Sequence, residues 1–82
     1  MPYINQEKRN KVDVVIDVME EVGIKADGDL NYILYKYCKE NVKPGYGNYK
    51  NFIAELEECA VEIRRRLMAD YEDKMIEING DV

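Results

Sequence analysis

The chain has 82 residues, of which 46% are hydrophobic and 35% are charged, and its formal net charge is -5 at pH 7. A chain of this length forms one domain and encloses no spacious pocket, so a sizeable ligand would have to bind in a surface groove or between copies. The acidic balance argues against a general binder of DNA, RNA or anionic membranes.

Several residue types that enzymes use most often are missing. The sequence contains no His, no Trp, no Ser and no Thr. The usual general base, the usual zinc ligand and the hydroxyl nucleophiles of most hydrolases are therefore absent. The stretch ADGDLN lacks the spacing of a calcium loop, and KPGYGN does not match a phosphate loop. We therefore expect a non-enzymatic protein without a metal or another cofactor.

The two cysteines, Cys38 and Cys59, are too few and too far apart for a disulfide framework or a CxxC metal site. Both lie on apolar faces of predicted helices, where a free Cys is typically a small buried hydrophobic residue; a bridge or a reactive thiol is the alternative. The chain shows neither a leader peptide nor a long apolar span, so we expect a cytoplasmic protein.

The first predicted helix covers about residues 6–22, with Asn5 as its N-cap and Gly23 as its C-terminal stop. The alternation in VDVVIDV leaves a strand as the competing prediction. One face of the predicted helix is apolar and consists of Val12, Val15, Ile16, Met19 and Val22.

The second predicted helix covers about residues 30–42, with Asp29 as its N-cap. The turn KPGYGN ends it and exposes Tyr46. Its apolar side chains are expected to form a core stripe that consists of Leu30, Ile33, Leu34, Tyr37 and Cys38.

The third predicted helix covers about residues 49–77, with Asn48 as its N-cap, and is about 40 Å long. Its apolar stripe loosens beyond Tyr71, because Lys74 falls on its continuation. The stripe consists of Phe52, Leu56, Cys59, Ala60, Ile63 and Leu67. The fold class that follows is an all-α, three-helix domain with a long C-terminal helix, which we expect to form a homo-oligomer.

Two tyrosines of the second helix, Tyr32 and Tyr35, lie outside its core stripe and neighbour each other on a second face. Another helix or a sister subunit could cover them. Alternatively, they could form an aromatic platform for a flat ligand such as a base, while their hydroxyl groups contact polar partners.

The segment EIRRRLMADYED carries three consecutive arginines, Arg64, Arg65 and Arg66. On a helical wheel Arg64 and Arg66 flank the apolar stripe and Arg65 points away from it. Guanidinium groups suit phosphate or carboxylate ligands, and Tyr71 is a further candidate ligand-binding residue. The alternative is ordinary ion pairing, because Glu62 precedes Arg66 by four residues and Asp70 follows it by four.

Five pieces of the sequence are spread over most of the chain: MPYI, GDLNYIL, YKNFIAELEECA, EIRRRL and YEDKMIEINGDV. Together they resemble a family of short phage and prophage proteins of unassigned function. The resemblance implies a phage origin and the cytoplasm of an infected host, and it supplies no catalytic residue.

Short, acidic, helical phage proteins include oligomeric sponges that sequester cyclic nucleotide signals and so silence bacterial immunity. Such a sponge needs aromatic rings for the base, guanidinium groups for phosphates and a cavity between subunits. We therefore expect an anti-defence protein that sequesters a nucleotide. The alternative is an adaptor or inhibitor that docks on a host or phage protein through Tyr32 and Tyr35.

Overall fold

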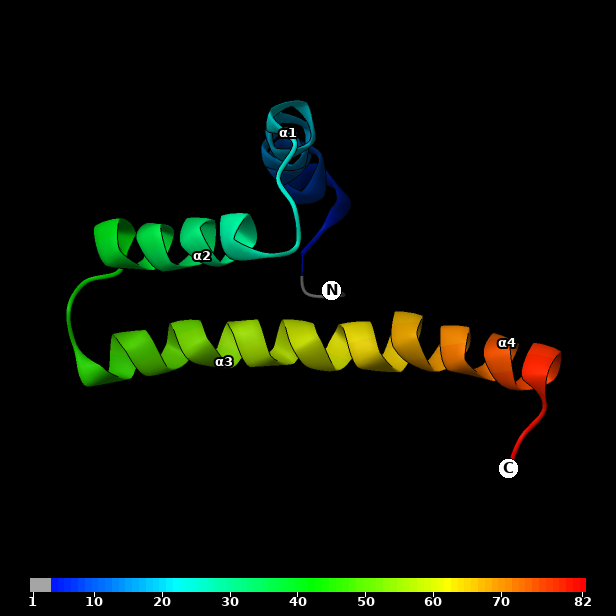
Figure 1. Cartoon of the computed structure of the whole chain (residues 1–82). Helices are drawn as coiled ribbons and strands as arrows, with labels where there is room; N and C mark the ends of the chain where they lie inside the picture. Colours follow the sequence, from blue (N-terminus) through cyan, green and yellow to red (C-terminus); the bar gives the residue numbers. More distant parts are fainter. Residues whose placement is uncertain (1–3) are drawn as a thin grey trace. The chain divides into compact units, whose positions relative to one another are not determined.

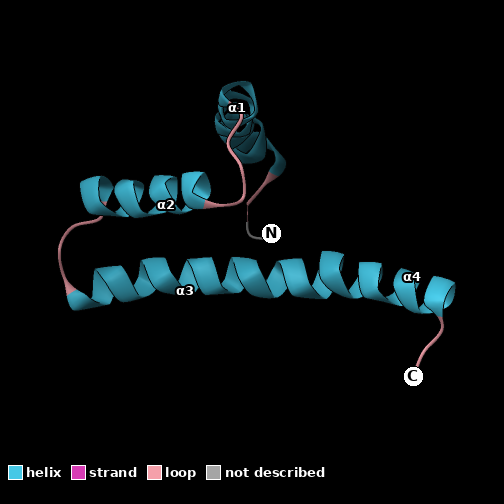
Figure 2. Ribbon diagram, in the orientation of Figure 1, coloured by secondary structure: helices cyan, strands magenta, loops and turns pink. Residues whose placement is uncertain are grey.

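The computed structural model describes residues 4–82, and these residues form helices joined by short loops (Figure 1). The helices are α1 (Gln6–Val22), α2 (Gly28–Asn41), α3 (Tyr46–Ile63), the π-helical turn η1 (Arg64–Met68) and α4 (Ala69–Asn79). The last three follow one another without a break and make a single helix of 34 residues. The predicted all-α fold with a long C-terminal helix is confirmed, and no strand occurs between residues 4 and 82 (Figure 2).

The chain divides into two compact units, Met1–Tyr37 and Cys38–Val82, and the boundary falls within α2. Each unit is described by itself below. The predicted apolar lead at residues 1–4 lies outside the described residues except for Ile4, which is half-buried.

Both predicted ends of α1 are confirmed. The side-chain oxygen of Asn5 accepts a hydrogen bond from the backbone N–H of Lys8 at 2.9 Å, which satisfies one of the free amides at the helix start. Gly23 has a φ of 79°, in the left-handed region, and its N–H donates to the carbonyls of Met19 and Glu20. A residue with a Cβ would be strained there, so glycine ends the helix.

The N-cap predicted for α2 is wrong by two residues. The side chain of Asp27 accepts a hydrogen bond from the N–H of Asp29 at 3.0 Å, and its carbonyl accepts one from Asn31 at 3.2 Å. Asp27 therefore occupies the capping position, and Gly28, which has no side chain to obstruct the turn, becomes the first helical residue. The carboxylate of Asp29 turns back to the N–H of Lys25 at 3.4 Å.

The third helix also begins earlier than predicted, at Tyr46, with Gly45 in the capping position. Asn48 is not the cap. It lies in the first turn and donates a side-chain hydrogen bond of 3.0 Å back to the carbonyl of Lys43. The helix ends two residues later than predicted, at Asn79, where the N–H of Gly80 donates to the carbonyl of Ile76 at 2.7 Å.

The five residues Arg64–Met68 form a π-helical turn in which the N–H of Ala69 donates to the carbonyl of Arg64, five residues earlier. Such a turn holds one residue more than an α-helical turn, so every later side chain is rotated back by about 100°. Tyr71, Met75 and Ile78 consequently take the positions that Asp70, Lys74 and Glu77 would occupy in an unbroken α-helix.

The apolar face therefore continues into α4. The prediction that it loosens at Lys74 is wrong, because that prediction assumed α-helical geometry throughout. Met75, which replaces Lys74 on this face, is half-buried.

No residue in the described part of the chain is fully buried. On α1, Val15 is 58% exposed and Val22 is 67% exposed; on the long helix, Leu67 is 67% exposed. The amphipathic faces predicted from the sequence exist as helix faces, but they do not form a buried core within the chain.

The predicted core stripe of α2 is only partly confirmed. Leu30, Ile33, Leu34 and Cys38 are half-buried, whereas Tyr37 is 59% exposed and does not belong to a core. Both cysteines are free; Cys59 is exposed rather than buried. No helix among residues 4–82 is both long and apolar enough to cross a membrane.

Two glycine substitutions test the assigned end of α1 and the assigned start of α3, and they are expected to change the free energy of unfolding with opposite signs. Gly23→Ala is expected to lower the free energy of unfolding by about 1–2 kcal/mol, because alanine resists the left-handed conformation. Gly47→Ala, inside α3 and with open space around the added Cβ, is expected to raise it by up to about 1 kcal/mol. Thermal unfolding followed by circular dichroism at one protein concentration measures both. Equal effects of the two variants would contradict the assigned helix ends.

Two single-residue deletions test the role of the π-helical turn. Deleting Leu67 converts the turn to α-helix and leaves Met75 and Ile78 on the apolar face, so the melting temperature is expected to stay within a few degrees. Deleting Asp73 instead rotates these two side chains off the face, and a loss of roughly 5 °C or more is expected. If the Leu67 deletion is the more harmful of the two, the proposed register is wrong.

Candidate functional site

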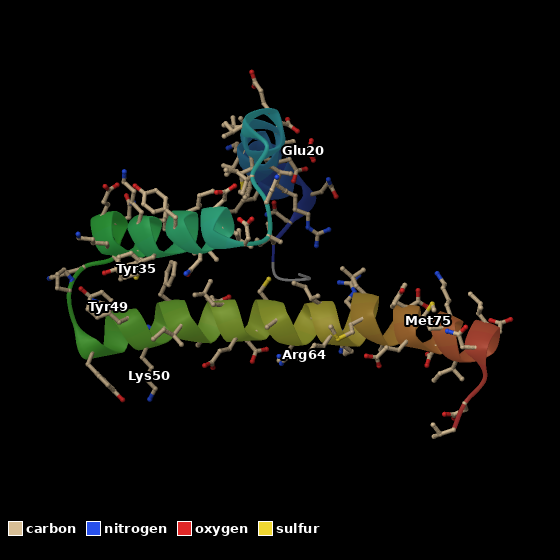
Figure 3. The ribbon with its side chains drawn as sticks, in the orientation of Figure 1. Glu20, Tyr35, Tyr49, Lys50, Arg64 and Met75 are labelled. Carbon is tan, nitrogen blue, oxygen red and sulfur yellow. The ribbon has the colours of Figure 1, made fainter. Side chains whose placement is uncertain are left out.

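The most concentrated positive charge in the described chain lies on η1, where Arg64, Arg65 and Arg66 form what we call the arginine turn. Consecutive helical residues point about 100° apart, so the three guanidinium groups spread around the helix. In Figure 3 Arg64 lies along the middle of the long helix, whereas Tyr49 and Lys50 lie near its start. All three arginines are exposed; the side chains of Arg65 and Arg66 are exposed to 73% and 60%.

The arginine turn has one acidic neighbour, Glu62, on the preceding helical turn. Its carboxylate oxygens lie 3.7 Å from a guanidinium nitrogen of Arg65 and 3.7 Å from one of Arg66. These distances are too long for hydrogen bonds, and Oε2 of Glu62 has no hydrogen-bond partner. The Glu62 side chain is only 30% exposed, but at these distances each contact is a loose ion pair, and the mostly exposed guanidinium groups keep hydrogen-bond donors for another anion.

The predicted ion pairs of Arg66 are half confirmed. The pair with Glu62 is present, whereas Asp70 pairs with Lys74 at 3.3 Å and not with Arg66. Arg66 lies inside the π-helical turn, and its extra residue moves Asp70 away from the face that Arg66 occupies. Arg64 forms no ion pair with any of the described residues.

Tyr71 lies on α4, on the same helix as the arginine turn, and is 62% exposed. It borders an open surface depression of about 450 Å³ that contains no arginine. The depression is lined by Tyr71, Glu72, Met75, Ile76, Asn79 and Gly80. A hollow along a single helix covers only one side of a ligand, and a small-molecule site usually surrounds most of its ligand.

The tyrosine pair predicted on the second face of α2 is present and solvent-accessible. Tyr32 is 62% exposed and Tyr35, labelled in Figure 3, is 69% exposed. The ammonium nitrogen of Lys36 lies 5.5 Å from the centre of the Tyr32 ring, within range of a cation–π interaction. This pair belongs to the unit Met1–Tyr37 and the arginine turn to Cys38–Val82, so each is described by itself.

The exposed loop tyrosine predicted from KPGYGN is also confirmed. Tyr46 is 84% exposed, with the ammonium nitrogen of Lys50 at 5.9 Å from its ring centre. It starts α3 instead of lying in the turn.

Sequence reasoning missed the π-helical turn, although the sequence contains a signal for it. After Ile63 the apolar residues Tyr71, Met75 and Ile78 all come one position later than an α-helical stripe requires. A uniform slip of one residue, starting at one point, indicates an inserted residue. No metal-binding group of three or more His, Cys, Asp or Glu side chains occurs in the part of the chain that the structure describes.

These features define a small all-helical protein whose helices expose apolar side chains and whose long helix carries three consecutive exposed arginines. The chain belongs to the family described as a domain of unknown function, DUF6899, whose model matches residues 1–82. No curated protein and no solved structure matches it. The resemblance to a family of unassigned function is thus confirmed, while a phage origin stays a prediction.

Proposed function

We propose that this protein is a non-enzymatic binding protein that works as a homo-oligomer in the cytoplasm. The observation that supports assembly is the absence of any fully buried side chain among residues 4–82, although 46% of the chain is hydrophobic. Ordering each residue costs about 1–2 kcal/mol, and apolar burial must offset that cost at roughly 25 cal/mol per Å². Helices of 14 and 17 residues, such as α2 and α1, gain most of their stability from a surface that covers their apolar faces.

We propose an anionic nucleotide as the ligand, in line with an anti-defence protein of phage origin that sequesters an immune signal. The arginine turn supports this proposal because its guanidinium groups are exposed and only weakly paired. The planar fork of arginine binds phosphate oxygens through two hydrogen bonds at once. Since the three groups point in different directions, one ligand contacts one or two of them in a chain and takes its other contacts, aromatic rings included, from a second copy.

A second candidate function is docking on a host or phage protein, through the exposed pair Tyr32 and Tyr35. Tyrosine is enriched at protein interfaces because its ring buries a large apolar area while its hydroxyl stays paired. This function needs no nucleotide and no arginine.

Assembly can be tested by light scattering across a dilution series. The expected mass is a multiple of the chain mass of 9.6 kDa, falling on dilution together with helical content. The two signals fall together because the helices depend on each other for cover. A monomer that keeps its full helical content at micromolar concentration would contradict the proposal.

Ligand binding can be tested with a panel of cyclic dinucleotides and cyclic ADP-ribose isomers, followed by heating to release what was captured. Arg64→Ala, Arg65→Ala and Arg66→Ala are made singly, and loss of a charge-assisted hydrogen bond is expected to weaken binding by about 1.5–3 kcal/mol, or roughly 10- to 150-fold. Lys74→Ala, which removes a cation that is paired with Asp70, is the matched control.

Recovery of an intact nucleotide supports sequestration, and recovery of a cleaved product would mean that the protein is an enzyme. If no nucleotide is depleted while Tyr32→Ala and Tyr35→Ala abolish capture of a protein partner, the docking function replaces the nucleotide proposal.

A further inference from the structure

We infer that the long helix formed by α3, η1 and α4 pairs with the same helix of a second copy in antiparallel orientation, centred between Ala60 and Val61. This inference rests on the assembly part of the proposed function and not on its ligand. It follows from the apolar face of the helix and from the charges beside that face.

The apolar face of the long helix is continuous and mostly exposed, with Phe52, Ala60 and Met75 half-buried. Its exposed members range from 37% exposed at Leu56 to 75% at Ile78. The π-helical turn keeps the face in line, because it brings Tyr71, Met75 and Ile78 to positions otherwise taken by charged residues. The complete face consists of Tyr49, Phe52, Leu56, Cys59, Ala60, Ile63, Leu67, Met68, Tyr71, Met75 and Ile78.

The charges beside this face are arranged in two rows. With the face centred on Leu56, Glu57 and Arg64 lie roughly 80–100° to one side, and Glu55 and Arg66 lie roughly 80–100° to the other. Each row therefore carries a glutamate before the helix centre and an arginine after it. The row of Glu55 and Arg66 also holds Glu62, about 120° from Leu56, so an antiparallel pair brings the two copies of Glu62 together in one like-charge contact. Such flanking positions select the partner and its direction in paired helices.

In an antiparallel pair of identical helices, each row faces the same row of the second copy, and residues at equal distances from the two-fold axis meet. Glu57 and Arg64 are equally far from the point between residues 60 and 61, and so are Glu55 and Arg66. One two-fold axis at that point thus places Glu57 opposite Arg64 of the second copy and Glu55 opposite Arg66 of the second copy. Symmetry doubles these to four pairs of opposite charge.

A parallel pair fits the charges less well. In a parallel pair each row faces the other row of the second copy at the same height along the helix axis. Glu57 then lies beside Glu55 of the second copy, which is a like-charge contact. Arg64 then lies between Glu62 and Arg66, one attractive and one repulsive neighbour.

The position of the axis also suits the shape of the helix. The small side chain of Ala60 lies on the apolar face beside the axis and lets the two backbones approach closely. About 30 residues of each helix, 46–75, then overlap over roughly 45 Å. In this arrangement Arg64 and Arg66 face glutamates of the second copy, whereas Arg65 points away from the interface and stays accessible to an anionic ligand.

A charge-exchange experiment tests the arrangement. One full-length variant carries Glu55→Arg with Glu57→Arg, and a second carries Arg64→Glu with Arg66→Glu. Each variant alone sets like charges against each other and is expected to associate at least tenfold more weakly than the native chain. Mixed in equal amounts, the two variants restore all four pairs, and association should return.

The matched control carries Glu58→Arg with Arg65→Glu, on the opposite side of the helix, and should associate like the native chain. Recovery on mixing shows that both variants still fold. If each variant alone associates as well as the native chain, or mixing restores nothing, the antiparallel arrangement is wrong.

Helix direction is measured separately with one spin label at Lys74→Cys in a chain that also carries Cys38→Ala and Cys59→Ala. An antiparallel pair places the two labels about 40 Å apart along the axis, whereas a parallel pair places them side by side. If the native chain associates and the labelled chain gives the short distance, the antiparallel inference is wrong but the proposed assembly stands. If the native chain is a monomer, the inference and the proposed assembly are both wrong.

Discussion

The constraint on which this structure depends is that its helices leave their apolar faces uncovered. No residue between 4 and 82 is fully buried, although each helix has the amphipathic pattern of an element that needs a partner surface. A folded chain of this size normally gains its stability from burial, since helix propensity and surface ion pairs contribute little. Which surface covers these apolar faces is therefore the central question for this protein.

The π-helical turn is related to the same constraint, because it keeps the apolar face of the long helix continuous. Such turns are rare, and they frequently occur at functional sites. Here the turn corrects the phase of the apolar face over the last part of the long helix, where three charged residues would otherwise interrupt it. It also carries all three consecutive arginines, so the feature that keeps the face continuous also holds the strongest local positive charge of an acidic protein.

The arginine turn serves both proposals, and its members serve them differently. In the antiparallel pair proposed above, Arg64 and Arg66 lie beside the apolar face and meet glutamates of the second copy. Arg65 lies on the opposite side, with only a 3.7 Å contact to Glu62. Substitutions at Arg64 and Arg66 thus test assembly, and substitution of Arg65 tests ligand capture, although the three positions are adjacent.

The sequence by itself determined the all-helical class, the start of α1 at Asn5 and its end at Gly23, because capping and left-handed glycine are local effects of a few adjacent residues. It also located the exposed tyrosines of α2 and the arginine cluster, since helical spacing assigns each residue to a face. Only the tertiary structure decided that Asp27 caps α2, that Arg64–Met68 is a π-helical turn and that Tyr37 and Cys59 are exposed. The physical reason is that a wheel of 100° per residue assumes an unbroken α-helix, and that an apolar pattern shows which face needs cover but not which surface supplies it.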